Sequence, residues 1–217
     1  MERRSRTSLA LPATLLVLSA IPIVISLVRL VQIPLGALPD DAFYFVAVPV
    51  WHFIHAAAGA LFGVLGPLQF GRVLAGRFGR AHRVAGRIFI GAGALLALSS
   101  LRLLWQFPGH STALLDLARL AAGLALGAFL ILAVLAIRRR DVLAHRAWMI
   151  RAYAIGMGVS TVSLIFFPIY VVTGEPVEGL ASDIVFVAAW SLNLVVAEWV
   201  IRRRPEPGAV PLPVSAR

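Results

Sequence analysis

Six long apolar runs, joined by short polar segments, make up most of the chain. They cover about residues 9–31, 44–70, 84–105, 117–137, 147–172 and 184–201. Each is close to the ~20 residues that an α-helix needs to cross the hydrocarbon core of a bilayer. The first run is too long for the apolar part of a signal peptide and lacks a clear cleavage site, so we expect it to be retained. The pattern predicts an all-α integral membrane protein, a bundle of six transmembrane helices.

The polar segments alternate in charge along the chain. The N-terminus, the segments after the second and fourth runs, and the C-terminus are rich in Arg, whereas the other three loops are acidic or neutral. Cytosolic loops of membrane proteins carry an excess of basic residues, so we expect both termini in the cytosol (N-in/C-in). The predicted organisation is a basic cytosolic N-terminus (1–8), a transmembrane domain (9–201) and a disordered, Pro-rich cytosolic tail (205–217).

Composition agrees with a membrane protein and excludes several classes of site. Hydrophobic residues make up 60% of the chain and charged residues 14%, whereas a soluble domain is near one half and one quarter. The net charge of +10 comes from Arg residues placed between apolar runs, which predicts contact with the lipid bilayer and no nucleic acid. Without cysteine, the chain has no thiolate metal site, iron–sulfur cluster or covalently attached haem.

Small residues and proline predict how the helices pack. Gly59 and Gly63 are four residues apart, as are Gly123 and Gly127, and this spacing gives faces on which helices approach closely. Pro22 lies inside the first run, where we expect a kink that neighbouring helices tolerate.

Two histidines lie at membrane depth in the second run. His52 and His55 are three residues apart and share one helical face. At ~1.5 Å per residue, His55 lies roughly 15 Å into the bilayer. An imidazole there is either a neutral ring bonded to a neighbouring helix or a cofactor ligand or proton relay.

Two His-Arg pairs lie at matching depths, where basic segments lead into the third and fifth runs. His82 and His145 are each followed by Arg, and the accompanying cations are Arg83, Arg87, Arg146 and Arg151. One interpretation makes these residues interfacial, with Arg side chains reaching lipid phosphate and fixing the topology. The other makes His82 and His145 the axial ligands of a b-type haem whose propionates pair with the Arg residues, or makes the pairs a site for a quinone or an anionic head group.

Other polar residues have simpler interpretations. Glu198 lies four residues before Arg202, a spacing that favours an ion pair within one helix, and Asn193 is expected to link helices. Catalytic patterns of soluble hydrolases, phosphate-binding glycine loops and the zinc motif His-Glu-x-x-His are absent from the sequence.

Three ordered motifs carry a family resemblance. They are His55 followed by Leu65-Gly-Pro-Leu-Gln-Phe70, then His82-Arg-x-x-Gly-Arg87, then His145-Arg-x-Trp-Met-Ile-Arg151. Over about residues 48–204 the chain resembles an uncharacterised bacterial family of predicted membrane proteins, domain of unknown function 2306. The resemblance implies a multi-span protein of the bacterial cytoplasmic membrane and no established activity. The His-Arg-x-x-Gly-Arg corner also looks, more loosely, like corners of cytochrome b561 and ferric-reductase haem proteins.

Together these observations lead to two hypotheses of different class. The first is a redox membrane protein that holds a b-type haem or a quinone near the cytosolic face, with His82 and His145 as ligands and His55 as a second ligand or relay. The second is a non-enzymatic protein, either a small-solute transporter or a partner- or lipid-binding subunit, whose His-Arg pairs serve topology and lipid contact.

Overall fold

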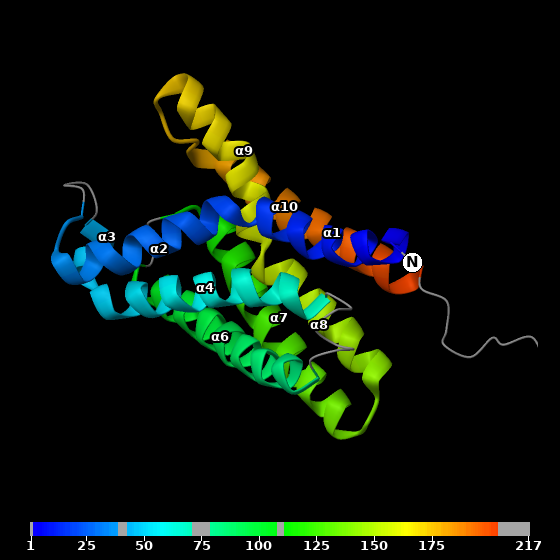
Figure 1. Cartoon of the computed structure of the whole chain (residues 1–217). Coiled ribbons are helices and arrows are strands. Elements are labelled where there is room, and N and C mark those ends of the chain that lie inside the picture. Colours follow the sequence, from blue (N-terminus) through cyan, green and yellow to red (C-terminus); the bar gives the residue numbers. More distant parts are fainter. Residues whose placement is uncertain (1, 39–42, 71–78, 108–110, 204–217) are drawn as a thin grey trace, which may run out of the picture.

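The computed structural model describes residues 2–38, 43–70, 79–107 and 111–203; the predicted tail at 205–217 lies outside them. These residues form helices joined by short connections and contain no strand (Figure 1). The helices are α1 (Glu2–Leu18), α2 (Ala20–Leu35), α3 (Phe43–Ala47), α4 (Pro49–Phe70), α6 (Gly79–Gln106), α7 (Ala113–Arg138), α8 (Val142–Gly156), α9 (Gly158–Thr173) and α10 (Gly179–Arg202).

The prediction of a membrane helix bundle is confirmed. Within the described residues, α4, α6, α7, α10 and the combined segment of α8 and α9 are each long and apolar enough to cross a membrane. The first predicted span is divided into α1 and α2, which meet at 58°. The described part of the chain therefore has five such spans, and six if this bent pair is one span.

The bend in the first span follows from its sequence. Pro22 has no backbone N–H, and its ring clashes with the carbonyl of Leu18, four residues earlier, so the helix is interrupted there. Ser19 lies at the break, 2% exposed, and its hydroxyl donates to the Leu15 carbonyl at 2.7 Å. The predicted kink near Pro22 is confirmed.

Glycine brings the helices of the bundle close together. α2 packs on α4, where a Cβ atom on Gly63 would lie 2.9 Å from the Ile23 side chain. Gly123 of α7 is equally close to Leu101 of α6, whereas Gly127 faces open space. The predicted packing face on α7 is therefore correct at Gly123 and wrong at Gly127.

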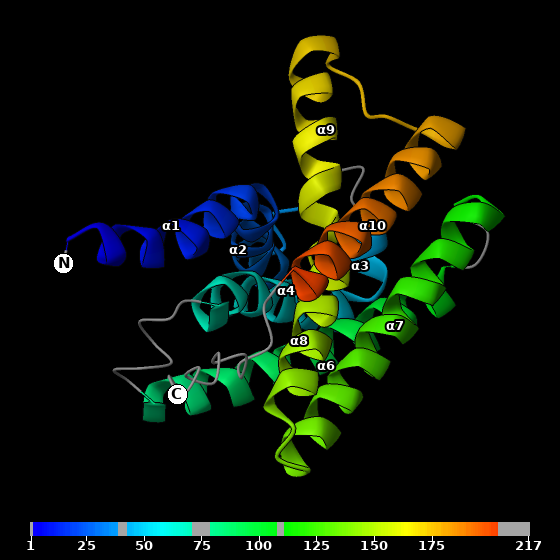
Figure 2. The ribbon, with the colours of Figure 1, turned by 90° about the vertical axis from the view of Figure 1, so that its right-hand side faces the viewer.

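The Arg-rich segments that the structure describes lie toward the same end of the bundle. The beginning of α1, the turn between α7 and α8, and the end of α10 all lie toward the right-hand side of Figure 1. We call this side, with the end of α4 and the beginnings of α6 and α8, the Arg-rich end. Figure 2 shows α9 continuing from α8 along one long path, with α10 crossing beside it.

Candidate functional site

His82 and His145 occupy equivalent places in their helices, since each is the fourth residue, in α6 and α8 respectively. Both helices begin five residues earlier than the apolar runs predicted. For α8 the reason is visible, because the Asp141 side chain accepts a hydrogen bond from the Ala144 N–H at 2.8 Å and caps the helix. The two imidazoles lie close enough for their charges to interact. The structure thus brings together the two histidines that the sequence paired.

The His145 ring has one defined tautomer. Its Nδ1 lies 2.8 Å from the carbonyl oxygen of Ala133 in α7. A carbonyl only accepts hydrogen bonds, so Nδ1 carries the hydrogen and Nε2 of the neutral ring keeps its lone pair. His145 therefore presents Nε2 as a potential ligand or acceptor.

His82 and Gln69 each bury a polar atom that has no partner among the described residues. The atoms are Nδ1 of His82 and the amide nitrogen Nε2 of Gln69. The Gln69 amide lies against Gly86, where a Cβ atom would be 3.3 Å from Gln69 Oε1. Because His82 and Gly86 are four residues apart on one face of α6, the amide lies close to the imidazole. We call Gln69, His82 and His145 the polar corner.

An aromatic layer lies beneath the polar corner. Tyr153, two turns from His145 on the same helix, packs against Gly66 of α4 and within 5.2 Å of the Phe70 ring, measured between centroids. Phe62 and Phe89 stack at 4.3 Å. Phe62, Phe89 and Tyr153 are all buried, so this layer closes the membrane-interior side of the corner with apolar rings.

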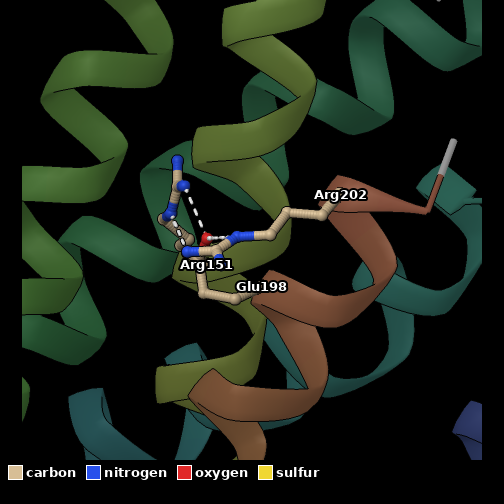
Figure 3. A network of polar contacts seen from close by, with 3 residues as sticks. All are labelled: Arg151, Glu198 and Arg202. Atoms are coloured by element: carbon tan, nitrogen blue, oxygen red, sulfur yellow. Dashed lines mark hydrogen bonds and ion pairs between the residues drawn. The ribbon is translucent and has the colours of Figure 1, made fainter.

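Arg151, predicted as an anion partner of a cofactor, already forms an ion pair within the protein. Its Nε and Nη2 donate to the two carboxylate oxygens of Glu198 in α10, at 2.5 and 3.1 Å (Figure 3). Its guanidinium also lies over the Trp148 ring. Arg202, the partner predicted for Glu198, is only at the limit of contact, with 4.0 Å between Nε and Oε2. The principal ion pair thus joins two helices and was not foreseen from spacing.

The other predicted cations, Arg83, Arg87 and Arg146, have exposed side chains at the Arg-rich end. All three lie on α6 and α8, the helices that carry His82 and His145.

His55 lies far from the polar corner. Its Nδ1 is 3.1 Å from the hydroxyl of Ser99, which itself donates to the Leu96 carbonyl, so the imidazole Nδ1–H donates to the serine. Ser99 is 17 residues beyond His82 in α6, roughly 25 Å along the helix axis. The structure therefore gives His55 a hydrogen-bonded place between α4 and α6 and does not bring it to His82 and His145.

The corner meets some requirements of a haem site and leaves others unmet. His145 fits, because a ligating imidazole normally has its other nitrogen hydrogen-bonded, as Nδ1 is here. Nδ1 of His82 has no such partner within the described ranges. Space for the macrocycle is another requirement. Cα atoms of α6 and α8 approach within 8 Å, and the Tyr153 ring and the Gln69 amide fill the spaces beside Gly66 and Gly86. Within the described residues, His, Asp and Glu form no group of three or more that could hold a metal ion.

Two functional candidates were missed from sequence. Gln69 occurred in a quoted motif, but a single Gln near the end of an apolar run gives no signal of its own. Asp183, the fifth residue of α10, is 2% exposed and accepts a hydrogen bond from Thr112, which also caps α7. Because Asp183 lies at the boundary of a predicted span, nothing in the sequence indicates that its carboxylate is buried. It lies at the end of the bundle opposite the polar corner.

Comparison with known proteins places this architecture in a family. The family model described as predicted membrane protein (DUF2306) matches residues 52–201, which include the whole polar corner. The curated proteins and the solved structures give no match. The comparisons do not support the looser likeness to cytochrome b561 and ferric-reductase proteins. The match spans more than half of the chain and agrees with its apolar helices, and the chain belongs to the DUF2306 family of predicted membrane proteins.

Proposed function

We propose that this multi-pass membrane protein binds the head group of a membrane quinone at the polar corner and serves in electron transfer. The observation that carries the proposal is a pair of buried nitrogen atoms, Nε2 of Gln69 and Nδ1 of His82, that have no hydrogen-bond partner among the described residues. A buried polar group without a hydrogen bond costs about 1–3 kcal/mol. Two such groups on facing helices favour a ligand that satisfies both.

The chemistry of the corner suits carbonyl oxygens. The Gln69 amide and a neutral imidazole each provide an N–H donor, and a quinone head group has two carbonyl acceptors on a flat ring. The aromatic layer formed by Phe62, Phe89 and Tyr153 offers an apolar floor for such a ring. His145 Nε2, with its lone pair, can accept a hydrogen bond from a hydroxyl of the reduced head group.

The proposal includes the orientation predicted from the sequence. With the Arg-rich end in the cytosol of a bacterium, both termini lie inside and the polar corner lies near the inner face of the cytoplasmic membrane. A quinone reaches this depth from the bilayer.

A b-type haem is the second candidate, supported by the anchored Nδ1–H of His145. A haem supplies one-electron chemistry at its iron when bound. His145 and His82 would hold the iron, and the exposed Arg83, Arg87 and Arg146 would pair with propionates. Arg151 would not take part, since Glu198 occupies it.

Titration of purified protein with short-chain benzoquinone and naphthoquinone analogues, followed by quenching of tryptophan fluorescence, tests the first candidate. We expect Gln69→Leu and His82→Phe each to weaken binding by about tenfold, the effect of losing one hydrogen bond. Gln106→Leu is the matched control, because Gln106 lies at the opposite end of α6, exposed. Equal affinities in all four proteins would refute a quinone site at this corner.

A dithionite-reduced minus oxidised visible spectrum separates the candidates. A sharp α-band that disappears in both His82→Ala and His145→Ala would favour a haem over a quinone as the ligand of the corner. A well-folded, colourless protein removes haem from consideration.

A further inference from the structure

A groove at the end of α10 forms a second polar and apolar surface, separate from the polar corner. It has a volume of about 540 Å³ and is lined by Leu194, Val195, Glu198, Trp199, Arg202 and Arg203. Trp199 is 53% exposed and Val195 65%, so the groove opens on the perimeter of the bundle. It runs from the apolar body of α10 to the Arg-rich end of the molecule.

The groove has an excess of positive charge. Its one carboxylate, Glu198, is held by two charge-assisted hydrogen bonds from Arg151 of α8 (Figure 3). Arg202 makes only a 4.0 Å contact with the same carboxylate, and its side chain is 80% exposed. Arg203 has no carboxylate partner in the described part of the chain. Because Arg151 already pairs with Glu198, the residues that line the groove carry more positive than negative charge.

Arg203 is also positioned. Its guanidinium lies over the Trp199 ring, 4.2 Å from the ring centre. This contact orders a long side chain that would otherwise move freely, and it leaves the N–H groups at the guanidinium edge available. Trp199 itself has the mixed apolar and polar character that places tryptophan at the membrane interface.

We propose that this groove is a binding site for an anionic phospholipid. The head-group phosphate lies between Arg202 and Arg203, and an acyl chain runs along Leu194 and Val195 past Trp199. The assignment rests on charge complementarity and on the order of the lining residues, cationic at the helix end and apolar toward the membrane interior. It is independent of the quinone proposal, since none of the polar corner residues lines the groove.

Native mass spectrometry of the detergent-purified protein, titrated with phosphatidylglycerol or with phosphatidylcholine, tests the site. We expect the double variant Arg202→Gln/Arg203→Gln to lose about tenfold or more in affinity for phosphatidylglycerol, with little change for phosphatidylcholine. Both residues are exposed, so the fold should not depend on them.

The matched control is Arg138→Gln/Arg139→Gln, which removes two exposed, consecutive Arg residues at the end of α7. This variant should bind phosphatidylglycerol like the wild type. Inorganic phosphate in excess should not compete, because it lacks the acyl chain. Equal wild-type affinity for the two lipids, equal losses in the two double variants, or displacement by phosphate alone would each overturn the assignment.

Discussion

The ring of Tyr153 lies so close to Gly66 that a Cβ atom at position 66 would be 2.2 Å from a ring carbon. This contact draws α8 against α4. It also places the tyrosine hydroxyl 3.4 Å from Ser19, at the bend of the first span. Three segments that are distant in sequence therefore share one layer directly beneath the polar corner.

Gly66→Ala should destabilise the protein. The new methyl group must displace the buried Tyr153 ring, and overpacking of this kind costs about 1–3 kcal/mol. Thermal unfolding in detergent should show a lower midpoint. Gly91→Ala is the control, since nothing lies within 4 Å of a Cβ atom there. Equal midpoints for the two variants would show that the ring is not wedged against Gly66.

The ion pair between Arg151 and Glu198 should couple α8 to α10. Removing one partner leaves a half-buried charge unpaired, so Arg151→Met and Glu198→Met should each lower the unfolding midpoint. The double variant should lose less stability than the sum of the two single variants, because neither charge is then left alone. Purely additive losses would mean that the pair contributes no coupling.

Arg202→Met provides the comparison for this cycle. Its guanidinium is exposed and only 4.0 Å from Glu198, so its removal should change stability by well under 1 kcal/mol. A loss of stability as large as that of Arg151→Met would instead support the ion pair between Glu198 and Arg202 that the sequence predicted.

Asn193 should stabilise the junction between α8 and α9. Its amide nitrogen donates to the Ala154 carbonyl at 3.1 Å, beside the interruption at Met157, and its oxygen accepts from the Thr161 hydroxyl at 2.9 Å. Asn193→Leu should therefore cost about 1–3 kcal/mol by leaving buried polar groups unpaired. Ser191→Leu, at an exposed position on the same helix, should have little effect. Similar unfolding midpoints for both variants would contradict this role.

Ser99 and Ser100 allow a sharp test of the His55 environment. Both hydroxyls donate to the Leu96 carbonyl, but only Ser99 accepts from His55. Ser99→Ala should lower the unfolding midpoint, since it leaves a buried imidazole N–H unpaired, whereas Ser100→Ala should not. Neither change should alter quinone affinity. A loss of quinone binding in Ser99→Ala alone would place His55 in the same functional unit as the polar corner.

Much of the fold was predictable because bilayer thickness dictates the length of apolar runs. The spans, the kink at Pro22, and the pairing of His82 with His145 all followed from spacing and polarity. The helix starts at Gly79 and Val142 could not be predicted in this way, because polar residues extend each helix beyond the apolar run. Asn193 was correctly expected to link helices, since a polar amide at membrane depth needs a partner on a neighbouring helix.

Most of the specific partners between helices could not be predicted from the sequence. Spacing alone favours Arg202 as the partner of Glu198, and only the crossing of α8 and α10 brings Arg151 closer. Gly123 and Gly127 have the same spacing as Gly59 and Gly63, yet Gly127 faces away from its neighbours. Gln69 became a candidate only because its amide lies against Gly86, one turn from His82, with its nitrogen buried and unpartnered by any described residue.

The most direct test of the central claim is to extract the lipids that remain bound to the protein after purification from its native membrane. Quinone is then measured by liquid chromatography per mole of protein, in the wild type and in Gln69→Leu, His82→Phe and Gln106→Leu. We predict bound quinone in the wild type and in Gln106→Leu, and its loss in the two corner variants. Wild-type protein without quinone, or the same amount in all four proteins, would contradict a quinone site at Gln69 and His82.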